Sequence, residues 1–66
     1  MDILVNGKTE SAPLSACLTD LLRERGNDVK TVVVELNGRI VPHEEFAQTC
    51  IQANDTLEIV HFVGGG

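Results

Sequence analysis

The chain ends in three consecutive glycines, Gly64, Gly65 and Gly66, and these residues offer the clearest chemistry in the sequence. A carboxylate is a poor acyl electrophile, so it must first be activated, and adenylation by ATP is the usual route. Because glycine has no Cβ, an activating enzyme can approach the backbone closely, and the Gly66 carbonyl is left unhindered. The pattern predicts that Gly66 is the reacting acyl group and that Gly64 and Gly65 thread it into partner active sites.

The other reactive side chains do not form a recognisable set. Cys17 and Cys50 make no CxxC pair, so we expect both thiols to be reduced and partly buried. Adding His43 and His61 gives no spacing typical of a zinc site. We interpret His43 as a surface turn residue and His61 as a partly covered structural histidine. Without a visible nucleophile–base pair or metal cluster, the sequence predicts a protein that is not an enzyme.

Size and charge narrow the class of protein further. A chain of 66 residues can form one small core, but not the deep pocket that most enzymes need. Its formal net charge of −5 has the wrong sign for binding phosphates, which argues against a nucleic-acid partner. No apolar run approaches the ~20 residues that span a bilayer, and the N-terminus is unlike a signal peptide. We therefore expect a soluble, cytoplasmic domain with no membrane partner.

A hairpin is predicted at the start of the chain. Met1, Ile3 and Val5 alternate with Asp2 and Leu4, which is the two-residue period of a strand. Asn6-Gly7 is a strong signal for a type I′ turn, because both residues tolerate positive φ. Residues 8–12 then return as a polar second strand, which Pro13 ends.

One amphipathic helix is predicted over residues 15–25. Ser15 is the expected N-cap, and Gly26 is the expected left-handed residue after the helix. The apolar positions recur at helical spacing and are Leu14, Cys17, Leu18, Leu21 and Leu22. The helix therefore has one apolar face to cover.

The second half of the chain carries two more β-rich segments, over residues 31–36 and 56–63. Between them we expect an Asn37-Gly38 turn, a short extended piece, a helical turn over residues 42–46 with proline at its first position, and Ile51 as an anchor into the core. The first and last strands must both bury apolar side chains under one helix. The economical arrangement is an α+β fold: a mixed four- to five-stranded sheet with both terminal strands central and the helix packed across one face.

Strand alternation predicts which side chains the helix leaves uncovered. Inward positions are Met1, Ile3, Val5, Val34, Leu36, Leu57 and Ile59. The outward positions are Leu4, Val33, Glu35, Val60 and Phe62. Of these, Leu4, Val60 and Phe62 form an exposed apolar patch, which is typical of a partner-docking site. We expect this patch to dock the enzymes that act on the tail.

The order of elements resembles the β-grasp, or ubiquitin-like, fold. Met1-x-Ile3-x-Val5 is similar to the opening strand of ubiquitin, and the chain likewise ends on a diglycine. Within that superfamily the chain resembles the ThiS family of sulfur carriers. The Leu21-Leu22 pair, the segment 34–42 ending in Val-Pro, and the segment 57–66 carry this resemblance. It implies a single β-grasp domain over residues 1–63 and a flexible glycine tail over residues 64–66.

The resemblance also implies a function. A ThiF-type enzyme, using ATP and Mg²⁺, would adenylate the Gly66 carboxylate, and a persulfide donor would replace AMP with sulfur. The Gly66 thiocarboxylate would then deliver sulfur to thiazole synthase, ThiG, for the thiazole ring of thiamine. The chain itself would bind no cofactor.

Other readings remain open on the residues alone. The chain could carry sulfur for molybdopterin synthesis, or be a ubiquitin-like modifier that forms isopeptide bonds through Gly66. It could also be an interaction domain whose tail has no role. The modifier would give conjugate ladders that depend on Gly66, whereas a carrier would gain sulfur at its terminus.

Overall fold

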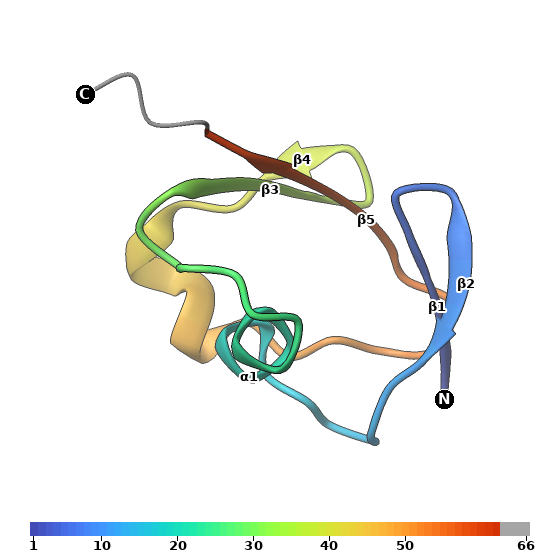
Figure 1. Cartoon of the computed structure of the whole chain (residues 1–66). Coiled ribbons are helices and arrows are strands. Elements are labelled where there is room, and N and C mark those ends of the chain that lie inside the picture. The colour runs from blue at the N-terminus through green and yellow to red at the C-terminus, as the bar shows by residue number, and fades with distance from the viewer. Residues whose placement is uncertain (63–66) are drawn as a thin grey trace.

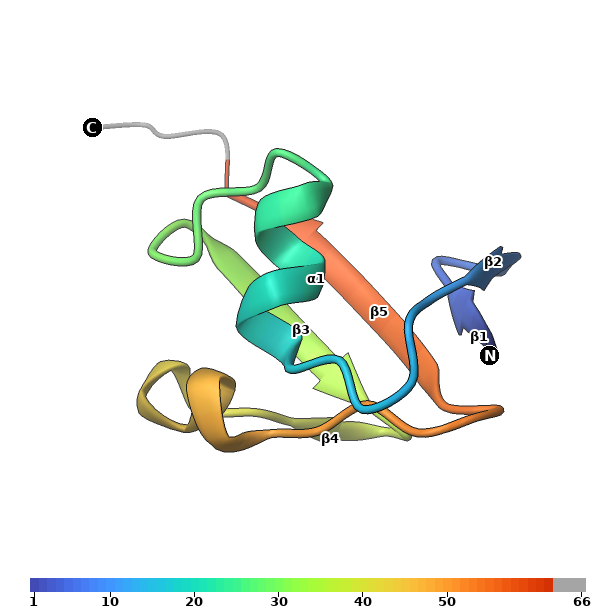
Figure 2. The same cartoon turned by 90° about the horizontal axis from the view of Figure 1, so that it is seen from below.

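A five-stranded mixed sheet curves around an α-helix in the computed structural model, which describes residues 1–62 (Figure 1). The strand order is β2-β1-β5-β3-β4, and helix α1 (Leu18–Glu24) lies across one face of the sheet (Figure 2). The strands are β1 (Asp2–Val5), β2 (Lys8–Ser11), β3 (Val32–Leu36), β4 (Arg39–Ile40) and β5 (Thr56–His61). The predicted α+β arrangement is therefore confirmed.

The first and last strands both lie inside the sheet, as predicted, and the structure shows that they pair with each other in parallel. The Leu4 N–H donates to the Asp55 carbonyl at 2.9 Å. The Asn6 N–H donates to the Leu57 carbonyl at 2.9 Å. The Asn6 side chain extends this ladder, because its Nδ2 donates to the Ile59 carbonyl at 3.3 Å and its Oδ1 accepts from the Ile59 N–H at 2.7 Å. With β3 on its other edge, β5 is held from both sides.

The core lies between the sheet and the helix. The buried apolar side chains are Ile3, Val5, Ala12, Leu18, Leu21, Leu22, Val32, Val34, Phe46, Ile51 and Leu57. Met1, Leu36 and Ile59 are partly buried against them, so the inward face predicted from alternation is confirmed. Ile51, 1% exposed, is the predicted anchor.

Both Asn-Gly turns have the predicted backbone. Asn6 and Gly7 have φ of 51° and 84°, and Asn37 and Gly38 have φ of 52° and 86°. Positive φ at both central residues is the type I′ pattern, which matches the twist of the strands it joins. Each turn fixes the register of its hairpin, pairing Val5 with Lys8 and Leu36 with Arg39.

The predicted start of the helix is wrong. Ser15 has φ of 62°, in the left-handed region, and the N-cap is Cys17, whose backbone is extended. The backbone around Cys17 pairs with the segment before β5, which holds it out of the helix. Leu14 is consequently 80% exposed and belongs to no helix face. In residues 1–62, no helix is long and apolar enough to cross a membrane.

The segment after β4 is also longer than predicted. Pro42 is extended, with ψ of 144°, and caps a 3₁₀ helix, η1 (His43–Gln48), rather than occupying its first position. Phe46 is the buried residue of η1, and it helps to pack η1 beside α1. This segment therefore closes one end of the core.

Candidate functional site

Strand β5 leads to the predicted reactive tail. The Phe62 N–H donates to the Thr31 carbonyl at 2.8 Å, so Phe62 still follows the sheet. The predicted reacting group, Gly66, and the predicted threading residues, Gly64 and Gly65, lie outside the described residues. The predicted boundary between domain and tail at residue 63 lies outside them too. Within residues 1–62 the candidate site is therefore the sheet surface beside Phe62.

All three predicted docking residues are exposed. Leu4 is 37% exposed, Val60 58% and Phe62 56%. Leu4 lies between the buried residues Ile3 and Val5, and Val60 follows the partly buried Ile59, so the alternation of each strand places both side chains on the sheet face opposite α1. Continuing the alternation of β5 puts Phe62 on the same face.

The sheet register brings only two of these three residues together. Val60 is the cross-strand partner of Val33, which is partly exposed, and Phe62 follows two residues later. Leu4 instead lies beside Thr56, four residues before Val60, or about 13 Å along β5. We call Val33, Val60 and Phe62 the apolar cluster, and Leu4 stands apart from it.

Two carboxylates lie next to the apolar cluster. Glu35 of β3 and Glu58 of β5 are direct cross-strand partners, and both are exposed. Ile40, 68% exposed, is the partner of Glu35 on its other side. Like charges directly opposite each other in a sheet destabilise it, so the acidic pair Glu35–Glu58 is costly for folding. Such a pair beside exposed apolar residues suits a partner that brings basic side chains.

The charged side chains on the sheet face opposite α1 are all acidic among the described strand residues. Assigned by register and alternation, they are Asp2, Glu35 and Glu58. Lys8 and Arg39 pair with the inward residues Val5 and Leu36, so their side chains start from the other face. The uncovered face is therefore acidic and apolar.

Ile40 and the acidic pair are features that sequence reasoning did not identify as part of the site. The signal was available in the Asn37-Gly38 turn, because a two-residue hairpin puts residue 40 opposite residue 35. The pairing of Glu35 with Glu58 joins strands far apart in the chain, and no local pattern specifies it.

Both histidines have structural contacts. His43 is exposed, as predicted, and its Nε2 lies 2.7 Å from the Val32 carbonyl. A carbonyl only accepts, so Nε2 carries the proton and donates it. His61 is exposed rather than partly covered, because it sits at the end of β5. Its Nε2 is 3.0 Å from the Thr31 hydroxyl.

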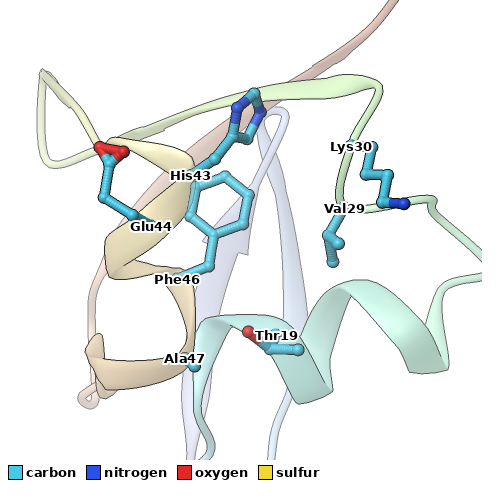
Figure 3. Close-up of a pocket in the computed structure, with 7 residues that line it drawn as sticks. All are labelled: Thr19, Val29, Lys30, His43, Glu44, Phe46 and Ala47. Atoms are coloured by element: carbon cyan, nitrogen blue, oxygen red, sulfur yellow. The ribbon is translucent and has the colours of Figure 1, made fainter.

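A hollow of about 370 Å³ lies on the helix side of the molecule (Figure 3). Its lining residues are Thr19, Val29, Lys30, His43, Glu44, Phe46 and Ala47. His43 and Phe46 form one wall, with ring centroids 5.1 Å apart, and Val29 and Lys30 face them across the opening. This hollow shares no residue with the apolar cluster.

The cysteines differ in exposure. Both are free thiols, and Cys17 is partly buried as predicted, but Cys50 is exposed. Cys50 lies in the segment between η1 and β5, directly before the buried anchor Ile51. In residues 1–62, no group of three or more His, Cys, Asp or Glu side chains is placed to hold a metal ion.

This chain is similar to several known proteins. The profile of the ThiS family matches residues 3–66. A thiazole synthase of Paramagnetospirillum magneticum is 41% identical over 66 residues, which are 100% of this chain and 20% of that protein. The sulfur carrier protein ThiS of Bacillus subtilis is 41% identical over 49 residues, 74% of each chain. The crystal structure of a thiamine biosynthesis protein (ThiS) from Geobacter metallireducens has a TM-score of 0.85 and 35% identity, with 100% of both chains covered.

The extent of these similarities differs. The chain spans only about a fifth of the length of the thiazole synthase that it matches, but all of the Geobacter structure. The fold and sequence are therefore alike over the whole sheet and helix.

Proposed function

Because the chain belongs to the ThiS family, we propose that it carries the sulfur atom for the thiazole ring in thiamine biosynthesis. The observation that carries this proposal is the family match over residues 3–66, which includes the terminal glycines. The names of two relatives, a sulfur carrier protein and a thiamine biosynthesis protein, support it. In this role the chain is a co-substrate of partner enzymes and not itself an enzyme.

The proposed chemistry takes place at Gly66. In the active site of a ThiF-type enzyme, a Gly66 carboxylate oxygen attacks the α-phosphate of Mg²⁺-bound ATP and releases pyrophosphate. The terminal sulfur of a persulfide donor then attacks the acyl carbon and expels AMP. The product is an acyl disulfide, in which the acyl carbon is bonded to the sulfur that the persulfide delivered. A thiol then attacks the donor sulfur of this acyl disulfide, breaks the sulfur–sulfur bond that came from the persulfide and forms a disulfide with the donor, so that the Gly66 thiocarboxylate remains. Gly64 and Gly65 allow the terminus to enter these active sites.

We propose that the apolar cluster and the acidic pair form the docking face for the adenylating enzyme. Val60 and Phe62 are more than half exposed; Val60 lies on β5, the strand that leads to the tail, and Phe62 directly follows it. The acidic pair predicts a partner surface with basic side chains around an apolar centre. Leu4 lies at the periphery of this face, because the register separates it from Val60.

Thiazole synthase is the proposed recipient of the sulfur. The support is that a thiazole synthase contains a segment 41% identical to this whole chain. Joining two proteins in one chain is an effective way to keep a donor close to its acceptor, because the second encounter becomes intramolecular.

The experiment is intact-mass analysis of the chain ending at Gly66. The chain is incubated with a ThiF-type enzyme, ATP, Mg²⁺ and a persulfide donor. We expect the mass to rise by the replacement of one oxygen with one sulfur, with the change located in the C-terminal fragment. The thiocarboxylate form should then support thiazole formation by thiazole synthase.

A chain that lacks Gly65 and Gly66 is the control, since it keeps every described residue. We expect it to gain no sulfur. Sulfur gained by this truncated chain, or found on Cys17 or Cys50 instead, would contradict the proposal. Conjugates of the full chain with protein lysines would favour a modifier instead.

A further inference from the structure

The two cysteines, far apart in sequence, face each other in the fold. Cys17, just before α1, and Cys50, between η1 and β5, form an isolated antiparallel bridge. The Leu18 N–H donates to the Thr49 carbonyl at 2.9 Å. The Ile51 N–H donates to the Ala16 carbonyl at 2.8 Å. These two hydrogen bonds flank the cysteine pair on either side.

This hydrogen-bond pattern determines how close the Cα atoms of the two cysteines are. In an antiparallel pair whose neighbours exchange the hydrogen bonds, the Cα atoms of the facing residues are ~4.5 Å apart and both side chains leave the same face. A disulfide needs Cα atoms ~4.4–6.8 Å apart with converging Cβ atoms. The backbone around Cys17 and Cys50 therefore already has the separation that a disulfide requires.

We propose that Cys17 and Cys50 are a dithiol–disulfide pair, which a small disulfide such as glutathione disulfide oxidises. The exposed Cys50 thiolate attacks one sulfur of glutathione disulfide and releases a first glutathione thiolate. The Cys17 thiolate then attacks the Cys50 sulfur, forms the Cys17–Cys50 bond and expels a second glutathione. The two protein thiols lose two electrons and two protons in total, and one glutathione disulfide becomes two glutathione thiols.

The disulfide acts on stability and not on docking. It ties the start of α1 to the segment that leads into β5, which runs past the N-terminal end of α1 (Figure 2). The apolar cluster and the acidic pair lie on the uncovered face of the sheet. The bond also closes a long loop of the chain, which restricts the unfolded state.

The experiment is equilibration of the purified chain in a series of reduced and oxidised glutathione mixtures, with intact-mass and peptide analysis. We expect a monomer that has lost two hydrogens and contains a Cys17–Cys50 peptide pair. Its thermal unfolding midpoint should exceed that of the reduced chain by about 10 °C or more. The Cys17→Ser variant should instead retain one glutathione on Cys50.

The double variant Cys17→Ser, Cys50→Ser controls for the effect of the buffer, and its midpoint should not respond to glutathione. The wild-type measurement depends on no variant, so a folding defect in Cys17→Ser leaves the test intact. Persistent glutathione adducts on the wild-type chain, a disulfide-linked dimer, or an oxidised monomer with an unchanged or lower midpoint would overturn the proposal.

Discussion

At the scale of single residues, the uncovered sheet face carries exposed apolar side chains and facing carboxylates, and neither kind of group stabilises the isolated domain. Val60 and Phe62 are more than half exposed, although both could be polar without any loss to the core. Glu35 and Glu58 oppose each other across β3 and β5, which costs stability. Residues that are unfavourable for the isolated domain are expected where a partner covers them, since a complementary surface removes both costs.

Replacing Val60 with aspartate tests the apolar cluster. We expect Val60→Asp to lower kcat/KM for adenylation by at least about a hundredfold, because a charge is forced into the centre of the interface. The fold should stay intact, since the side chain already faces solvent. Pyrophosphate release measures the rate. The control is Thr9→Asp, which adds the same charge on the same face but on the edge strand β2. It should change kcat/KM for adenylation little. Equal rates for Val60→Asp and wild type would remove Val60 from the docking face.

Replacing Glu35 with glutamine separates stability from docking. We expect the free energy of unfolding to rise by about 0.2–1 kcal/mol, because one of two facing carboxylates is neutralised. Affinity for the adenylating enzyme should fall severalfold. Urea unfolding and surface plasmon resonance measure the two effects. Glu24→Gln on α1 is the matched control for net charge, and an identical loss of affinity there would mean that only total charge matters.

At the scale of elements, the placement of β5 depends on a side-chain clamp. The Asn6 amide makes two hydrogen bonds to the Ile59 backbone and so continues the β1–β5 ladder beyond the end of β1. The same asparagine supplies the positive φ of the first hairpin turn. One residue thus joins the first hairpin to the strand that carries Val60.

Replacing Asn6 with glycine isolates this clamp, because glycine keeps the positive φ and removes the amide. We expect the free energy of unfolding to fall by about 1–2 kcal/mol and hydrogen exchange at the Ile59 amide to accelerate. Asn54→Gly is the matched control: Asn54 also has a positive φ, of 70°, and glycine keeps the hydrogen bond from its backbone N–H to the Asp2 carbonyl, whereas the amide that holds Ile59 belongs to Asn6. Unchanged exchange at Ile59 in Asn6→Gly would show that the clamp does not hold β5.

At the scale of the whole molecule, the net charge of −5 agrees in sign with the acidic uncovered face. A negative net charge attracts a basic partner from a distance, and in the proposed docking the acidic face then orients that partner. This long-range attraction is screened by salt, whereas burial of the apolar cluster is not.

Salt should therefore slow docking more than it weakens the formed complex. We expect the association rate constant with the adenylating enzyme to fall about tenfold between 0.05 and 0.5 M NaCl, with a much smaller change in the dissociation rate constant. Stopped-flow measurements in NaCl check this. An association rate that does not respond to salt would mean that the acidic pair has no steering role.

The elements that sequence reasoning predicted best are those with local causes. The two Asn-Gly turns follow from the backbone preferences of two adjacent residues, and the inward face of β1, β3 and β5 follows from a two-residue period. The predicted helix start failed for the opposite reason. Leu14 fits the helical period and Ser15 has the side chain of a good N-cap, but pairing of the backbone around Cys17 with a distant segment excluded both residues from α1.

The same distinction holds for the candidate site. The sequence by itself determined the terminal glycines, the acidic charge and which side of β1, β3 and β5 faces solvent, because these depend on residue type and local period. Only the tertiary structure decided that Val60 adjoins Val33 and not Leu4, that Glu35 faces Glu58, and that Cys17 faces Cys50. Register between distant segments is set by the joint packing of one core, and no segment encodes it alone.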